Sequence, residues 1–493
     1  MLRSPTAIRL TSSHQGVLML KRTTPVFLTF LCLLGPALIT TMANSAETDE
    51  PRSVILLIGD GFDDQHVTMG RNYLAGPDGK LLLDTMPVRG AVQVQTVDHD
   101  GRWTYVADSA NTATTLATGV VTNIGRVGTG PADEDVTTIL EMAAAAGYGT
   151  GAVSTSSITD ATPASFIAHV SKRICEGPET ILGGEKYGLP FEGCYEDAQG
   201  SGGPGSIAEQ IMASPIDVAL GGGLLYFSER LPDGQTSVLD TANDHNALVI
   251  TDPEQLTSPI PDDKRLIGLF ASEHLPVRWQ GDGGRKAESP DPSWLNLLDW
   301  RLGSVEQPAV MSCGPNPEYG NTPSLAALTR VAIERLTSTT NKGFFLIIES
   351  ASIDKKSHER NPCGSIGEIA QLEEALQVAL DYAKQQENTM VLVTADHAQA
   401  AQIVPEPSLF DDIPVPVYSP GKIARIQLDD GTIMRINYAT NNFESEEHTG
   451  ANVPLFANEA ARAYLNPYMR QQDIFEAMKE FLGLNVTHDT DGL

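Results

Sequence analysis

Short apolar runs that stop abruptly at polar residues are the feature of this sequence that most constrains its fold. Residues 54–58 lead into Gly59-Asp60-Gly61, residues 344–348 lead into Glu349, and residues 390–394 lead into Ala395-Asp396-His397. Continuous runs of this kind, rich in β-branched residues, are typical of central parallel strands that are buried on both faces. Open sheets of this type bind ligands at the carboxyl ends of their strands. We therefore expect the polar residues after these runs to meet at one edge of a sheet.

Segments with helical periodicity lie between the apolar runs. They cover residues 136–146, 325–336 and 367–386, and in the last of these Ile369, Leu372, Leu376, Leu380 and Ala383 share one face. Strands that alternate with helices predict an α/β fold with a large, mostly parallel central sheet and helices on both faces. Residues 176–206 and 280–320 are rich in Gly, Pro and Ser and are expected to be loops or excursions from the main fold. Asp429-Asp430-Gly431 is expected to be a hairpin turn.

The N-terminus has the pattern of an export signal. Lys21 and Arg22 precede an apolar run at residues 26–39, and small residues follow at 41–46. The run is shorter than the ~20 residues of a membrane span but suits a signal peptide. We expect a signal peptide at residues 1–46, a single domain at residues 47–493, and a periplasmic or secreted protein with no stable membrane span after processing. An uncleaved anchor is the alternative.

Four cysteines remain once residues 1–46 are removed, namely Cys175, Cys194, Cys313 and Cys363. An even number of cysteines in an exported chain predicts disulfides. Three connectivities are possible, and pairing of sequence neighbours, Cys175–Cys194 and Cys313–Cys363, is the simplest.

The chain is strongly acidic, with 63 Asp and Glu residues against 33 Lys and Arg residues and a formal net charge of −30. Binding to a nucleic-acid backbone needs a basic face, so the charge argues against a nucleic-acid partner. The acidity fits adaptation to high salt and equally fits the ordinary acidity of many exported enzymes.

Four separate segments carry residues of the types that commonly serve as metal ligands. They contain Asp60, the Asp354/His358 pair, the Asp396/His397 pair and His448. Asp354 and His358 are four residues apart and would share a helix face. Mixed Asp and His ligands without cysteine suit zinc at a catalytic site. Each signal taken alone has a structural explanation, and only their coincidence with predicted strand ends favours a metal site.

Ser109 precedes an Ala/Thr-rich stretch that predicts a helix ending at Gly119. A serine at a helix start meets amide groups and a dipole that favour a bound anion. The competing interpretation is that Asp108 or Ser109 merely caps the helix. No Gly-x-Ser-x-Gly motif surrounds Ser109, so a metal would have to activate its hydroxyl.

Several motifs occur together in a fixed order, and as a set they are specific. They are Ile58-Gly59-Asp60-Gly61, Asp108-Ser109-Ala110, Asp160-Ala161-Thr162-Pro163-Ala164, His169-Val170-Ser171-Lys172-Arg173, Ile353-Asp354-Lys355, Thr394-Ala395-Asp396-His397 and His448-Thr449-Gly450. The set resembles the successive motifs of bacterial alkaline phosphatases and covers nearly all of the chain after residue 46.

The resemblance implies a role for each matching residue. Ser109 would be the nucleophile of phosphate monoester hydrolysis at alkaline pH, and Arg173 would hold the phosphate. Two zinc ions and one magnesium ion would be bound. The implied ligands are Asp354, His358 and His448 for one zinc, Asp60, Asp396 and His397 for the other, and Asp60, Thr162 and Glu349 for magnesium. Asp160 and Lys355 would form a pair that supports the magnesium site.

The resemblance also implies a broad range of small phosphate monoesters as substrates and a homodimer. A phosphodiesterase or nucleotide pyrophosphatase of the same superfamily is the nearest alternative, but those relatives generally lack the full set Asp60, Thr162 and Glu349. A non-catalytic exported protein that binds metal or phosphate is the second alternative. It would need no positioned serine, so Ser109 argues against it.

Overall fold

Ten strands form the central sheet of the computed structural model, which describes residues 50–186, 189–406, 408–410, 412–413 and 415–484. In spatial order they are β23 (Tyr468–Arg470), β2 (Val88–Gln93), β22 (Val453–Ala457), β16 (Thr389–Thr394), β1 (Ser53–Gly59), β15 (Phe344–Ser350), β5 (Gly149–Ser157), β8 (Val218–Gly222), β10 (Arg265–Leu269) and β9 (Ala247–Ile250). The strands from β16 to β9 are parallel, and β22 runs antiparallel to both of its neighbours. The predicted large, mostly parallel sheet is therefore confirmed.

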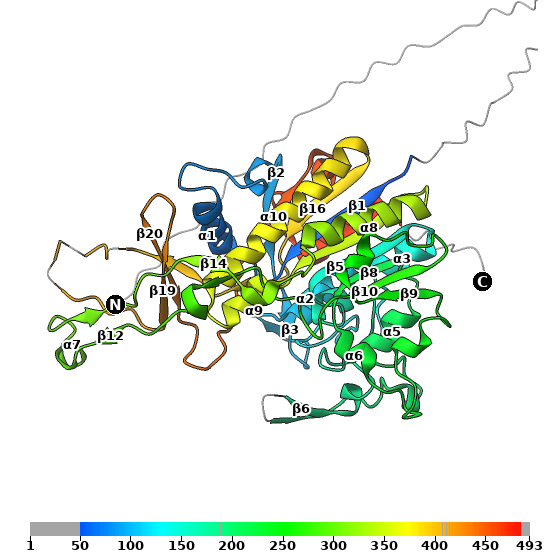
Figure 1. Cartoon of the computed structure of the whole chain (residues 1–493), viewed down its shortest axis with the longest axis horizontal. Helices are drawn as coiled ribbons and strands as arrows, with labels where there is room; N and C mark the ends of the chain where they lie inside the picture. Colours follow the sequence, from blue (N-terminus) through cyan, green and yellow to red (C-terminus); the bar gives the residue numbers. More distant parts are fainter. Residues whose placement is uncertain (1–49, 187–188, 407, 411, 414, 485–493) are drawn as a thin grey trace, which may run out of the picture. The chain divides into compact units, whose positions relative to one another are not determined.

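The three apolar runs of the sequence are β1, β15 and β16, and every residue of these strands is buried. Helices cover both faces in two packed groups. One group contains α1 (Asp64–Leu74), α8 (Leu325–Thr339) and α10 (Pro362–Gln385), and the other contains α2 (Ser109–Thr118), α3 (Ile139–Ala145), α4 (Ala161–Ala164) and α11 (Gln471–Phe481). Figure 1 shows α10 and α8 lying along the sheet. The core thus lies between the sheet and these helices.

Two helix starts differ from the prediction, and α8 continues to Thr339, beyond the expected end at 336. Helix α10 begins at Pro362, five residues before the expected start at 367, because Asn361 caps it by accepting a hydrogen bond from the Gly364 amide at 3.1 Å. Helix α3 begins at Ile139 rather than at 136, since Thr138 forms a capping box with Glu141. Caps decide both starts, and a count of apolar positions does not detect a cap.

Of the two alternatives for residues 280–320, the structure shows an excursion that contains short elements rather than a plain loop. These include β11 (Trp279–Gly281), β12 (Asp291–Pro292), α7 (Trp294–Leu298), β13 (Val305–Glu306) and β14 (Cys313–Pro315). A bridge between Glu288 and Ile423 joins this segment to a small sheet of β18 (Gln402–Val404), β20 (Ile433–Tyr438) and β19 (Lys422–Gln427). The predicted hairpin turn is confirmed between β19 and β20, where Gly431 has a φ of 85°.

The predicted signal peptide at residues 1–46 lies outside the described residues. Among the described helices, none combines the length and apolar composition that a membrane crossing requires.

Both predicted pairings of sequence neighbours are present as disulfides, Cys175–Cys194 and Cys313–Cys363. The second disulfide fastens β14 to the first turn of α10, and it closes a segment with a sequence separation of 50. The first closes a separation of 19.

We expect the Cys313→Ala/Cys363→Ala double variant to lose about 4 kcal/mol of unfolding free energy, because its unfolded chain gains the freedom of the longer loop. The Cys175→Ala/Cys194→Ala double variant is the matched control, with an expected loss of about 3 kcal/mol. Urea unfolding under oxidising conditions measures both. Equal stability of the first variant and the parent would contradict the prediction.

Candidate functional site

Four neighbouring strands bring the predicted residues together at one edge of the sheet. The strands lie in the order β16, β1, β15, β5. Asp60 follows β1 directly, Glu349 is next to last in β15, and Asp396 lies two residues beyond β16. Asp160 follows β5 and caps the short helix α4, which carries Thr162. The expectation that these polar residues meet at the carboxyl ends of parallel strands is confirmed.

Ser109 is the first residue of α2, and Asp108 is the N-cap of this helix. The Asp108 carboxylate accepts from the Asn111 backbone amide at 3.1 Å, and the Asn111 side-chain oxygen accepts from the Asp108 backbone amide at 3.0 Å. Because Asp108 caps the helix, the Ser109 hydroxyl is free to point elsewhere. Its Oγ lies 3.1 Å from His397 Nε2 and 3.4 Å from Asp60 Oδ1.

Asp60, Asp396 and His397 form the first cluster of side chains that could hold a metal ion. Their ligand atoms lie within 4.8 Å of one another, and all three side chains are buried. His397 Nε2 is 3.4 Å from Asp60 Oδ1 and 3.5 Å from Asp396 Oδ2. The other Asp396 oxygen accepts the amides of Gly61 and His397. These amides fix the Asp396 carboxylate while Oδ2 faces the cluster.

Asp354, His358 and His448 form the second cluster. The Nε2 atoms of both histidines lie 3.3 Å from Asp354 oxygens and 3.0 Å from each other. His358 Nδ1 contacts the Glu446 carbonyl, and His448 Nδ1 lies 2.7 Å from the Ala107 carbonyl. A carbonyl can only accept, so each Nδ1 donates, and Nε2 is the ring atom of each histidine that would face a metal ion. The ring of His448 stacks on that of His397 at 3.7 Å, which places the two clusters side by side.

In the absence of a cation, burial and neighbouring charged groups shift the pKa values of side chains in both clusters. Burial and the neighbouring Asp396 raise the pKa of Asp60 well above its ordinary value. Burial also lowers the pKa of His397. Asp354 is buried as well, but His358 and His448 hold the pKa of its carboxyl well below the usual range. Buried carboxylates that face each other are neutralised by a proton or by a positive partner, and a divalent cation is one such partner.

Thr162 and Glu349 supply further oxygen atoms. Ser154 and Ser156 donate hydrogen bonds to Glu349 Oε2, the latter at 3.0 Å. Glu349 Oε1 and Thr162 Oγ1 are buried and make no hydrogen bond of ordinary geometry with a described residue. Burial raises the pKa of Glu349 to about 7. Unsatisfied hard oxygen donors of this kind suit magnesium.

Arg173 and Lys355 flank Asp160. Arg173 Nη2 lies 3.0 Å from Asp160 Oδ1, its Nη1 lies 3.4 Å from Asp108 Oδ2, and Lys355 Nζ donates to Asp160 Oδ2. Although burial opposes ionisation, Lys355 and Arg173 hold the pKa of Asp160 well below its ordinary value. Asp108 thus joins the helix that carries Ser109 to the arginine that would face a bound phosphate.

Several supporting residues escaped sequence reasoning. Gln399 donates to Asp354 Oδ1 at 2.8 Å, and Ser154 and Ser156 hold Glu349. The run of four hydroxyl residues at 154–157, inside a strand buried at every position, was a usable signal for the serines. No sequence signal pointed to Gln399, since a single glutamine after a strand is common.

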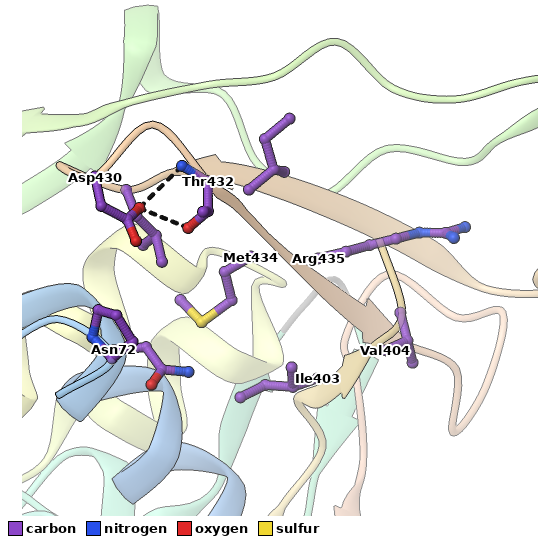
Figure 2. A pocket seen from close by; sticks show the side chains of 10 residues that line it. Asn72, Ile403, Val404, Asp430, Thr432, Met434 and Arg435 are labelled. Atoms are coloured by element: carbon purple, nitrogen blue, oxygen red, sulfur yellow. Dashed lines mark hydrogen bonds between the residues drawn. The ribbon is translucent and has the colours of Figure 1, made fainter. Parts of the chain in front are cut away.

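Two cavities lie outside the clusters. One of about 220 Å³ lies between α1 and the small sheet, and Figure 2 shows Asp430 beside it, accepting from the Thr432 amide and hydroxyl at 2.9 and 2.6 Å. Another of about 590 Å³ is lined in part by Ser171 and Lys172, which precede Arg173. Neither cavity is lined by a residue of the two clusters.

Comparisons with known proteins agree with this geometry. The family model of alkaline phosphatase matches residues 51–440. The alkaline phosphatase of Escherichia coli K12 is 38% identical over 454 residues, which cover 90% of this chain and 89% of that protein. The streptomycin-6-phosphate phosphatase of Streptomyces griseus is 36% identical over 92% of this chain and 97% of its own.

Solved structures show the same fold. The alkaline phosphatase of the Antarctic bacterium TAB5 superposes with a TM-score of 0.63 and 24% identity, covering 89% of this chain and all of that one. The family model covers the segments that carry Ser109, the first cluster, Asp354 and His358, and it ends before His448. The chain is an enzyme and belongs to the alkaline phosphatase family, which hydrolyses phosphate monoesters.

Proposed function

We propose that Ser109 accepts the phosphoryl group from the monoester. In the first step a bond forms between its Oγ and phosphorus, the bond to the ester oxygen breaks, and the alcohol leaves. In the second step water attacks the phosphoserine, the bond from phosphorus to Oγ breaks, and inorganic phosphate leaves. One observation carries this proposal. The Ser109 hydroxyl faces Asp60 and His397, while the neighbouring Asp108 performs the capping that would otherwise explain a serine at this position.

Arg173 is proposed to hold the phosphate during both steps. A guanidinium group is planar and can donate to two phosphate oxygens at once. Asp108 and Asp160 contact its two terminal nitrogens and so fix the orientation of the plane. Arg173 would then present the phosphorus to Ser109 at a defined distance and angle.

The proposed cofactors are two zinc ions and one magnesium ion. Asp354, His358 and His448 would hold one zinc, Asp60, Asp396 and His397 the other, and Asp60, Thr162 and Glu349 the magnesium. When bound, such ions act as Lewis acids, lower the pKa of a coordinated hydroxyl and stabilise a leaving alkoxide. The mixed nitrogen and oxygen donors fit zinc, and the oxygen-only set with its unsatisfied Thr162 and Glu349 atoms fits magnesium.

Asp160 and Lys355 are proposed to support the magnesium site without touching the substrate. Lys355 Nζ donates to Asp160, and its charge keeps the Asp160 carboxylate ionised. The ionised carboxylate would orient water beside magnesium, while its other oxygen contacts Arg173 at 3.0 Å.

The proposed setting is the periplasm or the exterior of the cell, after removal of residues 1–46 from a single catalytic domain at residues 47–493. The two disulfides support an oxidising compartment. A homodimer that acts on a broad range of small phosphate monoesters follows from the family resemblance. Light scattering of the purified protein would test the dimer.

Turnover of an aryl phosphate monoester and of the corresponding diester tests the proposed function against the phosphodiesterase alternative. The second ester group occupies an oxygen that would accept from Arg173, and loss of one charge-assisted hydrogen bond costs about 1.5–3 kcal/mol. We expect kcat/KM for the monoester to exceed that for the diester by about 10- to 150-fold at alkaline pH. Diester turnover equal to or faster than monoester turnover would overturn the assignment.

A further inference from the structure

Arg360 is a buried arginine that lies two residues beyond His358, and the reaction described above does not use it. Its side chain is 2% exposed. Its backbone φ is 57°, in the left-handed region that residues with a Cβ rarely adopt. A strained backbone and a buried cation persist only where the surrounding structure holds them in place. The contacts of Arg360 therefore indicate what it holds.

The guanidinium group of Arg360 directs its donors to one segment, residues 441–446. Its Nε donates to Glu446 Oε2 at 2.6 Å, its Nη1 donates to the Glu444 carbonyl at 2.9 Å, and its Nη2 donates to the Phe443 carbonyl at 2.8 Å. This segment has no helix or strand, and Glu446 is its only fully buried residue. The pair of Arg360 and Glu446 thus anchors a segment that apolar packing does not hold.

The anchored segment connects the two histidines of the second cluster. The Glu446 amide donates to the His358 carbonyl at 2.9 Å, and the Glu446 carbonyl accepts from His358 Nδ1. His448 follows Glu446 by two residues, and its Nε2 lies 3.0 Å from His358 Nε2, although the two histidines are 90 residues apart in the chain. Arg360 is therefore close in sequence to one histidine and holds the segment that leads directly to the other.

We propose that Arg360 and Glu446 are positioning residues that set the metal affinity of the cluster of Asp354, His358 and His448. The proposal rests on the metal sites of the proposed function. The first cluster takes its geometry from the ends of β1 and β16 and has no described contact with this pair. Arginine suits the role because its rigid fork of donors reaches several acceptors at once, which a lysine ammonium cannot match.

Zinc binding to the chelator-stripped protein tests the proposal. Competition with a chromogenic zinc chelator resolves the affinities of the two zinc equivalents. We expect Arg360→Ala to weaken one equivalent by about 10- to 100-fold, which is the usual effect of losing a residue that orients a ligand, and to leave the other unchanged. Arg360→Lys and Glu446→Gln preserve side-chain size, so they serve if the alanine variant does not fold. Each should weaken the same equivalent by a smaller factor.

Arg71→Ala is the control for loss of an ion-paired arginine away from the clusters, because Arg71 donates to both carboxylate oxygens of Asp84, at 2.7 Å each. This variant should unfold at a lower temperature and keep both zinc affinities. Weakening of zinc by Arg71→Ala to the same extent would show a general effect of instability and would overturn the positioning role. Parental affinities in Arg360→Lys and Glu446→Gln would also overturn it while leaving the metal sites intact. An unmodified protein that binds no zinc would overturn the metal sites themselves.

Discussion

Replacement of Ser109 by alanine is expected to abolish the phosphoenzyme and to reduce kcat for an aryl phosphate monoester by about 10³-fold or more. In the proposed first step Oγ forms the only new bond to phosphorus, so the covalent intermediate cannot form without it. The structure gives this atom a suitable place, 3.1 Å from His397 Nε2 at the start of α2. Incubation with labelled monoester, acid quenching and mapping of the labelled peptide measure the intermediate.

Ser165→Ala is a matched control for this experiment. Ser165 is also a buried serine, and its hydroxyl donates to the Ala110 carbonyl at 3.1 Å on the same helix α2. Loss of that bond should cost about 1 kcal/mol of stability and leave the labelled peptide in place. Labelled phosphate on the Ser109→Ala protein would show that another residue is the nucleophile.

The contrast between Ser109 and its neighbour shows what the sequence could and could not establish about the site. The segment Asp108-Ser109 predicts a helix start, and either residue can cap a helix. Sequence pattern alone could not assign the cap, because both side chains have the required oxygen. The structure assigns it to Asp108, whose carboxylate also accepts the Gly125 amide at 3.1 Å. That second contact comes from a loop residue outside the helix, which the local pattern does not include.

The sheet could be predicted because a strand that is buried on both faces is apolar at nearly every position and so appears as a continuous apolar run. Residues 54–58, 344–348 and 390–394 show this pattern, and they became β1, β15 and β16. The rule that ligands gather at strand ends then placed Asp60 and Asp396 together. The helix starts were less accurate, since capping by Asn361 and Thr138 depends on single polar side chains.

Residues that support the site from distant segments could not be predicted. Arg360 and Glu446 are 86 residues apart and pair in a buried ion pair, yet each alone resembles an ordinary surface charge. Ion pairs of this kind depend on the tertiary fold, and no local period or motif encodes them. The candidate ligands could be named because they follow apolar runs, share a helix face or match a family motif, whereas these supporting residues have no such signal.

Removal of bound metal is expected to abolish monoester turnover and to lower the unfolding temperature. The clusters concentrate buried carboxylates, and burial together with Asp396 raises the pKa of Asp60 when no cation is near. A cation that binds only the folded chain adds stability, about 4 kcal/mol when free metal exceeds the dissociation constant a thousandfold. Dialysis against a chelator, elemental analysis, an activity assay and thermal unfolding measure the effect. Zinc with magnesium should restore both activity and stability.

Chelator already saturated with zinc is the control for direct effects of the chelator on the chain, and it should change neither quantity. The two disulfides remain intact during chelation, so any loss of stability reflects the clusters rather than the covalent links. If elemental analysis shows a metal-free protein that still hydrolyses monoesters at the original rate, the two clusters are not catalytic metal sites. Ser109 would then need a base from the chain, and His397 at 3.1 Å is the side chain in position to act as one.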